Sequence, residues 1–310
     1  MQFYPKNSLD KLDFPFILKE LENLCSGTLG KQLLQQQSFL TNLDALNKQL
    51  QFVKEAKEII ENDTQLPQYG FNELPFLQKL KIDNYYLDVK ELIELYYALS
   101  SVAEVFRFFT PKARQQLYPF LSEKITDYNL ELGLIASISK VIDIDKEIVR
   151  ENATPELSKI RKQIQEKIQE INAVFRRVLS AHKQQNVLAD TEETIRDGRR
   201  VLSVKSEYKR IIKGLITDES DNGNITYIEP NATVFLNNEL TELYLDERRE
   251  IHKILVDITA KIQPYKENIE SLQELMSELD VIRAKAYFAV NYNCSMPQLS
   301  KERQIYLREF

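Results

Sequence analysis

The sequence predicts a mainly α-helical protein, in which a helical core domain is joined to a long antiparallel two-helix arm that carries a small antiparallel β-sheet at its end. Three observations support this fold class. Apolar residues recur at helical spacing through most of the 310 residues. Two of these patterns are long heptad seams. The segment between the seams, residues 194–230, instead alternates β-branched and polar residues and holds three of the chain's seven glycines.

Residues 1–150 are predicted to form the helical core domain. Short amphipathic segments follow one another here, and the clearest of them is residues 89–109. Its apolar residues recur at intervals of three and four, which places them on one face of a helix. They are Leu92, Leu95, Leu99, Val102 and Phe106. The aromatic residues of this segment are therefore interpreted as core packing.

Residues 151–193 are predicted to be the ascending helix of the arm. Thr154 suits the N-cap and Pro155 suits the first helical position, which together are a strong signal for a helix start. Apolar residues then form a heptad seam. The seam runs through Leu157, Ile160, Ile164, Ile171, Val174 and Val178.

Residues 231–280 are predicted to be the descending helix, and residues 281–310 to return to the core. The second seam runs through Leu240, Leu243, Ile251, Ile254, Ile258, Ile262, Ile269, Leu272, Met276 and Leu279. Pro264 is expected to kink this helix, because proline removes a helical hydrogen bond and its ring clashes with the preceding turn. The two long helices are expected to pack antiparallel.

Residues 194–230 are predicted to form the small sheet. Asp197 and Gly198 suit a tight hairpin turn, and a half-buried strand is expected around Val201. A second strand is expected in residues 210–217 and a third in residues 224–229.

Charge is unevenly distributed along the chain. The formal net charge is −6, which by itself disfavours nucleic acid, but residues 155–213 hold 14 Lys and Arg against 8 Asp and Glu. Within the sheet, residues 194–213 are basic, whereas residues 214–230 hold four acidic residues and no basic one. Only one part of the sheet can therefore attract phosphates. The two arm helices have opposite charge, which can mean simply that they neutralise each other along their seam.

Seven cations of the sheet are the candidate nucleic-acid-binding residues. Lysines and arginines on a curved strand surface bind phosphates without base specificity, and such binding depends on salt. A charged, solvated sheet edge that discourages aggregation would have the same pattern, so both interpretations stay open. The candidates are Arg196, Arg199, Arg200, Lys205, Lys209, Arg210 and Lys213.

No catalytic residue, metal site or cofactor is predicted for this chain. Residues 26–34 resemble a phosphate-binding loop only loosely, because two residues instead of four separate the glycines and Gln follows the Lys. His182 and His252 stand alone, and Cys25 and Cys294 are too far apart in sequence to suggest a metal motif or a disulfide framework. With no signal peptide and no run of about 18 apolar residues, the chain is expected to be cytoplasmic and away from membranes.

Four segments resemble the second bacterial branch of the MutS superfamily, the branch that lacks the mismatch-reading domains and usually ends in an Smr nuclease domain. The resemblance is strongest in residues 195–251, and it extends to residues 12–34, 154–164 and 278–289 in the expected order. One departure is the second half of the clamp, residues 217–230, where the family more often has a less acidic segment with small residues.

The resemblance implies a helical core, a lever of long helices and a clamp-like β tip. It also implies that an ABC-type ATPase domain, which would bind ATP and Mg, follows Phe310, and that homodimerisation occurs mainly through that domain. Full-length members would be ATPases, but this chain contains none of the family's nucleotide or nuclease residues. It is therefore expected to be a non-catalytic part of such a protein.

Three functions are compatible with these observations. The first is a lever and clamp that encloses branched or duplex DNA in the suppression of recombination and in DNA repair. The second is a clamp that grips stalled or collided ribosomes, because positive charge on the tip would contact ribosomal RNA equally well. The third is a helical interaction scaffold whose seams bind another helix.

Overall fold

The computed structural model describes residues 8–62, 67, 71–300 and 306. The chain is mainly α-helical with small antiparallel sheets, as the sequence predicts. It forms two compact units, one made of residues 1–147 and 258–310 and the other of residues 148–257. The last residues, 301–305 and 307–310, where the resemblance places the approach to an ATPase, lie outside the described residues. Among the described residues, none of the helices combines the length and the apolar composition that a membrane span requires.

The first unit is built around one long helix near the end of the chain. Helix α12, Lys266–Asn291, packs against α2, α3 and α4. A second layer forms where α6 contacts α7, α8 and α9. The elements are α1 (Ser8–Lys11), α2 (Phe14–Leu24), α3 (Thr28–Gln36), α4 (Leu43–Asn62), α5 (Phe76–Lys79), α6 (Val89–Phe109), α7 (Lys112–Leu117), α8 (Pro119–Thr126), α9 (Leu132–Val141) and β1 (Ile142–Asp143). Helix α6 has the bounds that the apolar spacing predicts.

Two buried carboxylates cap helices in this unit. Asp280 of α12 accepts hydrogen bonds from the amides of Ser26 and Gly27, at 3.0 and 2.9 Å, just before α3. Glu55 of α4 accepts hydrogen bonds from the amides of Phe120 and Leu121, at 2.9 and 2.8 Å, in the first turn of α8. These carboxylates satisfy amides that have no partner within their own helix. Both acidic side chains are therefore structural.

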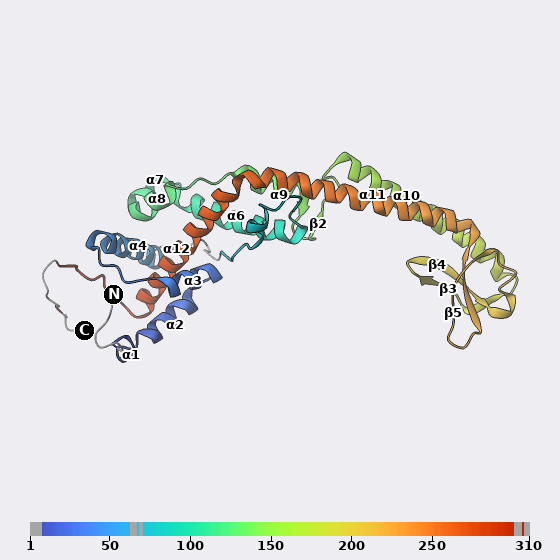
Figure 1. Cartoon of the computed structure of the whole chain (residues 1–310), viewed down its shortest axis with the longest axis horizontal. Coiled ribbons are helices and arrows are strands. Elements are labelled where there is room, and N and C mark those ends of the chain that lie inside the picture. The colour runs from blue at the N-terminus through green and yellow to red at the C-terminus, as the bar shows by residue number, and fades with distance from the viewer. Residues whose placement is uncertain (1–7, 63–66, 68–70, 301–305, 307–310) are drawn as a thin grey trace. The chain divides into compact units, whose positions relative to one another are not determined.

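The second unit contains two long helices and a four-stranded sheet. Its elements are β2 (Ile148–Val149), α10 (Pro155–Lys183), β3 (Leu188–Arg196), β4 (Arg199–Lys205), the 3₁₀ helix η1 (Ser206–Tyr208), β5 (Gly214–Glu219), β6 (Ile225–Pro230) and α11 (Asn231–Ile262). The predicted start of α10 is confirmed: the Thr154 hydroxyl accepts a hydrogen bond from the amide of Leu157 at 3.1 Å, and Pro155 is the first helical residue. The sheet lies at the end of the helix pair where α10 ends and α11 begins (Figure 1).

The sheet is antiparallel, with strand order β3-β4-β6-β5. One of its faces packs against the last turns of α10 in a compact apolar cluster. This burial holds the sheet on the helix. The cluster consists of Phe175, Val187, Leu188, Leu202, Val204, Ile212 and Ile228, with Val178, Leu179 and Tyr208 packed against it.

The predicted hairpin turn is confirmed. Asp197 and Gly198 connect β3 to β4 with φ angles of 48° and 76°. Two consecutive positive φ values are the geometry of the two-residue turns that match the twist of a hairpin, and Asp-Gly is a favoured pair there.

Three predicted boundaries were wrong. The ascending helix ends at Lys183 instead of extending to residue 193, because Asn186 has a φ of 55° and the following residues form strand β3. The strand predicted from residue 210 begins only at Gly214, since Ile212 turns into the apolar cluster. The return to the core was predicted from residue 281, but residues 258–310 already belong to the first unit. The interruption predicted at Pro264 is confirmed, because a 3₁₀ turn, η2 (Gln263–Tyr265), separates α11 from α12.

Candidate nucleic-acid interface

The two long helices of the second unit run side by side and antiparallel. Three polar contacts show this, because residue numbers that rise along α10 pair with numbers that fall along α11. Thr154 contacts Glu250 at 2.9 Å, Arg161 contacts Glu247 at 2.7 Å, and Lys167 contacts Glu239 at 2.8 Å. The opposite charges of the helices are thus partly neutralised across the seam, as one interpretation of the sequence expects.

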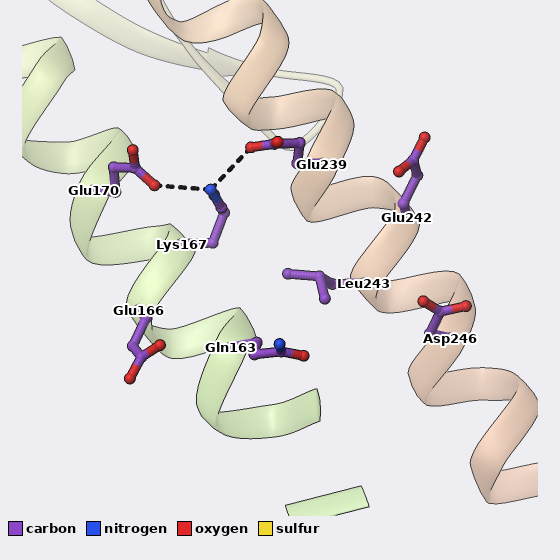
Figure 2. A pocket seen from close by; sticks show the side chains of 8 residues that line it. All are labelled: Gln163, Glu166, Lys167, Glu170, Glu239, Glu242, Leu243 and Asp246. Carbon is purple, nitrogen blue, oxygen red and sulfur yellow. Dashed lines mark hydrogen bonds and ion pairs between the residues drawn. The ribbon is translucent and has the colours of Figure 1, made fainter. Parts of the chain in front are cut away.

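An acidic groove of about 440 Å³ lies between these helices (Figure 2). Lys167 points between Glu170 and Glu239, and its ammonium lies 2.8 Å from a carboxylate oxygen of each. The hydrogen bonds that Lys167 donates to Glu170 and Glu239 raise the pKa of Lys167. One lysine faces five carboxylates, so the groove would repel a phosphate backbone. It is lined by Gln163, Glu166, Lys167, Glu170, Glu239, Glu242, Leu243 and Asp246.

Two of the predicted cations form exposed ion pairs with strand β5. Arg196 Nε lies 3.2 Å from a carboxylate oxygen of Asp218, and Lys209 Nζ lies 3.0 Å from one of Glu219. The guanidinium of Arg196 also stacks on the ring of Tyr227, with 4.2 Å between its central carbon and the ring centroid. The acidic second half of the sheet therefore neutralises part of the basic first half.

The Arg196–Asp218 pair also shows that the sheet is curled. Arg196 ends β3 and Asp218 lies on β5, and these are the two edge strands of the sheet. In a flat sheet, edge strands three spacings apart would be separated by about 14 Å. The direct contact requires the edges to approach each other, which brings basic and acidic strands together.

Arg199 and Arg200 are structural. Arg199 Nη1 lies 3.0 Å from a carboxylate oxygen of Glu229, and that carboxylate is buried and also accepts a hydrogen bond from Asn237 at 2.7 Å. Arg200 pairs with Glu193 at 2.5 Å. Its guanidinium also donates to Asn172 at 2.7 Å and covers the ring of Phe175, so it fastens the sheet to α10.

The other three predicted cations have no carboxylate partner among the described residues. Lys205 donates to the carbonyl oxygen of Asn186 at 3.3 Å. Arg210 and Lys213 are exposed, and within the described chain their side chains have no hydrogen-bond or ion-pair partner. Both lie in the connection between η1 and β5. Four of the seven candidates are thus paired with carboxylates, and the other three can bind an anion without breaking an ion pair.

Two exposed arginines on α10 were missed in the sequence. Arg176 and Arg177 follow Phe175, which packs under the sheet, and neither has a side-chain partner in the part of the chain that the structure describes. The sequence signal was the Arg-Arg doublet between the seam residues Val174 and Val178. Neighbouring positions on a helix cannot both face the core, so at least one of these arginines had to be exposed. These residues add unpaired positive charge on the helix that supports the sheet.

The described residues show no arrangement for metal chemistry. No group of three or more His, Cys, Asp and Glu residues among them is placed to hold a metal ion. Cys25 and Cys294 are free thiols, and burial together with the charge of Asp280 raises the pKa of Cys25 to about 12. That thiol stays protonated near neutral pH and is a poor nucleophile.

Comparison with curated proteins finds relatives along nearly the whole chain, although no family model matches it. A protein named Endonuclease MutS2 from Alkaliphilus oremlandii is 30% identical over 304 residues, which are 98% of this chain and 38% of that protein. Proteins of the same name from Caldanaerobacter subterraneus subsp. tengcongensis and Finegoldia magna are each 29% identical, over 98% and 95% of this chain and 38% and 37% of their own lengths. The chain spans well under half the length of these relatives. On this similarity, and on the segments that resemble the second bacterial branch of the MutS superfamily, the chain belongs to the MutS2 family.

Proposed function

We propose that this chain is a non-catalytic DNA-binding lever and clamp of a MutS-like ATPase, and that it grips branched or duplex DNA in the suppression of recombination and in DNA repair. The observation that supports the proposal is the pairing pattern of the sheet. After four candidate cations are neutralised within the fold, Arg210 and Lys213 remain exposed and unpaired among the described residues. In this proposal these two residues, with Lys205, contact phosphates.

The expected binding is weak for one chain and strongly dependent on salt. Each phosphate contact on duplex DNA releases counterions and contributes about −0.9 to the slope of log affinity against log salt. Two or three contacts are far fewer than tight DNA-binding proteins make. A homodimer would double the contacts and enclose the DNA, so dimerisation through a neighbouring ATPase domain, which would bind ATP and Mg, is part of the proposal. The nuclease activity that the relatives' name implies would belong to another part of the protein.

The acidic groove between α10 and α11 limits where DNA can lie. Its carboxylates would repel phosphates, so DNA is expected to bind at the sheet and at the turns of α10 that pack against the sheet. Arg176 and Arg177 lie in those turns, and they extend the candidate surface beyond the sheet.

A mobility-shift titration with a four-way junction and a matched duplex, repeated at rising salt, tests the proposal. The decisive variant is Arg210→Glu with Lys213→Glu. It should bind at least tenfold more weakly and reduce the salt slope by about 1.8, the loss of two duplex phosphate contacts. Arg199→Glu and Arg200→Glu are unsuitable, because they would break the structural pairs with Glu229 and Glu193.

The matched control is Lys159→Glu with Arg248→Glu. Both residues are exposed in the same unit, near the end of the helix pair that is far from the sheet, and the change in net charge is identical. Absence of binding by the unmodified chain at low salt would count against the proposal, and so would equal losses in the two double variants. Because the same cations would contact ribosomal RNA, the titration also includes an RNA helix of equal length, which should not be preferred over the junction.

A further inference from the structure

Three ion pairs of the sheet differ clearly in the burial of their carboxylates. The carboxylate of Glu229, which holds Arg199, is only 1% exposed, whereas the side chains of Asp218 and Glu219 are 52% and 48% exposed. Breaking the buried pair would leave an uncompensated charge away from water. Exposed pairs are weak and are screened by salt. The pairs Arg196–Asp218 and Lys209–Glu219 can therefore open without unfolding the sheet.

The two exposed pairs lie at the same end of one strand. Asp218 and Glu219 are consecutive on β5, where they stand opposite Tyr227 and Thr226 of β6. Successive side chains of a strand point to opposite faces, so one pair lies on each side of this edge strand. If both carboxylates move away, Arg196 becomes free to bind an anion on one face of this edge strand and Lys209 on the other.

We propose that Arg196 and Lys209 are masked phosphate contacts. In the free protein they are paired with Asp218 and Glu219, and the phosphodiester backbone of DNA displaces these carboxylates when it binds. This inference rests on the proposed function, because it concerns the same sheet and the same class of ligand. Displacement of the carboxylates would also select among anions. Only an anion with closely spaced charges can replace two carboxylates at once, and duplex DNA carries one charge per about 1.7 Å of its axis.

The contacts of Arg196 support its role after displacement. Its guanidinium lies over the ring of Tyr227 and also donates to the carbonyl oxygen of Ile195 at 3.4 Å, so the side chain keeps these two contacts when Asp218 leaves. A guanidinium is planar, and its N–H groups suit two phosphate oxygens. Among the described residues, Lys209 contacts no aromatic ring, and its flexible ammonium acts as a point charge. Arg196 is therefore the more ordered of the two contacts.

The test removes the masking carboxylates without changing the cations. Asp218→Asn with Glu219→Gln should tighten binding to a four-way junction about tenfold at low salt, because each exposed pair that no longer has to be broken contributes up to a factor of about five. In this variant Arg210 and Lys213 should still contact phosphates. Adding Arg196→Gln and Lys209→Gln to this variant should remove the gain and reduce the salt slope by about 1.8.

The matched control is Glu207→Gln with Asp221→Asn. Both residues are exposed acidic residues of the same sheet region, and neither has a cation partner among the described residues. The net charge changes equally, so the control should gain much less affinity. Equal gains in the two variants would overturn the inference, as would a gain that survives the loss of Arg196 and Lys209. If no protein binds at low salt, the proposed function itself has failed. Hydrogen exchange at β4 amides confirms that each variant keeps the sheet.

Discussion

Glu229 connects three elements through one buried carboxylate. It lies on β6, pairs with Arg199 of β4, and accepts a hydrogen bond from Asn237 of α11. Asn238, the next residue of α11, accepts a second hydrogen bond from Arg199 at 2.9 Å. These contacts fix the start of α11 against the sheet. A residue that the sequence shows only as part of an acidic stretch is thus a structural anchor.

The first prediction compares this carboxylate with an exposed one. Glu229→Ala should lower the free energy of opening of strands β4 and β6 by about 3–5 kcal/mol, because Arg199 and Asn237 would lose a buried partner. Asp218→Ala should lower it by no more than about 1 kcal/mol. Native-state hydrogen exchange at the amides of both strands measures the difference. Similar losses in the two variants would contradict the assignment of Glu229 as the anchor.

The second prediction concerns the buried thiol of Cys25. Burial raises its pKa from 9.0 to about 12, so between these values the unfolded chain loses a proton that the folded chain keeps. The folded state then binds more protons, and its stability must fall as the pH rises from 9 towards 12. Below pH 9 the contribution is fully present. The melting temperature of the unmodified chain should therefore drop more between pH 8 and 10.5 than that of Cys25→Ala.

Cys294→Ala is the control for the thiol, because it removes a partly exposed cysteine from the same unit. Its melting temperature should fall with pH as much as that of the unmodified chain. An equal fall in the Cys25→Ala variant would show that ionisation of Cys25 does not contribute.

Elements that depend on local signals were predictable from the sequence, and the others were not. Helix α6 and the start of α10 follow from apolar spacing and from Thr154 and Pro155, which lie within a few residues of the helix they determine. The first part of β3, residues 188–193, was wrongly predicted as helix, because the pairing of β3 with β4 is irregular between Leu188 and Glu193 and a regular alternation is absent there. Its position depends on β4 and on the apolar cluster, which a local pattern does not reveal.

The third prediction concerns the start of β5. A Cβ atom at Gly214 would lie 2.3 Å from the carbonyl oxygen of Glu229 and 2.5 Å from a methyl carbon of Ile228. The first of these atoms belongs to the backbone of β6 and cannot move without breaking the strand pairing. Gly214→Ala should therefore lower the opening free energy at β5 amides by about 1–3 kcal/mol. Ile211→Ala, at a nearby exposed position, should change it by less than about 0.5 kcal/mol.

At the scale of the whole molecule, net charge says little about where an anion binds. The chain has a formal charge of −6, yet exposed cations remain on the sheet and on α10. The sequence shows that residues 155–213 carry an excess of Lys and Arg, but it does not show which of these cations are paired. Arg196 and Arg199 find carboxylates 22 and 30 positions away along the chain. Such pairs exist only once the sheet has formed and curled.

The last prediction follows from the distance between the acidic groove and the sheet. Glu166 lies nine residues before Phe175, which packs under the sheet, so the two are about 13 Å apart along α10. Electrostatic effects extend about 30 Å at 0.01 M salt but only about 8 Å at 0.15 M. Neutralising the groove with Glu166→Gln, Glu242→Gln and Asp246→Asn should thus strengthen DNA binding at 0.01 M and have no effect at 0.2 M. A gain that persists at 0.2 M salt in the same titration would mean that DNA lies in the groove itself.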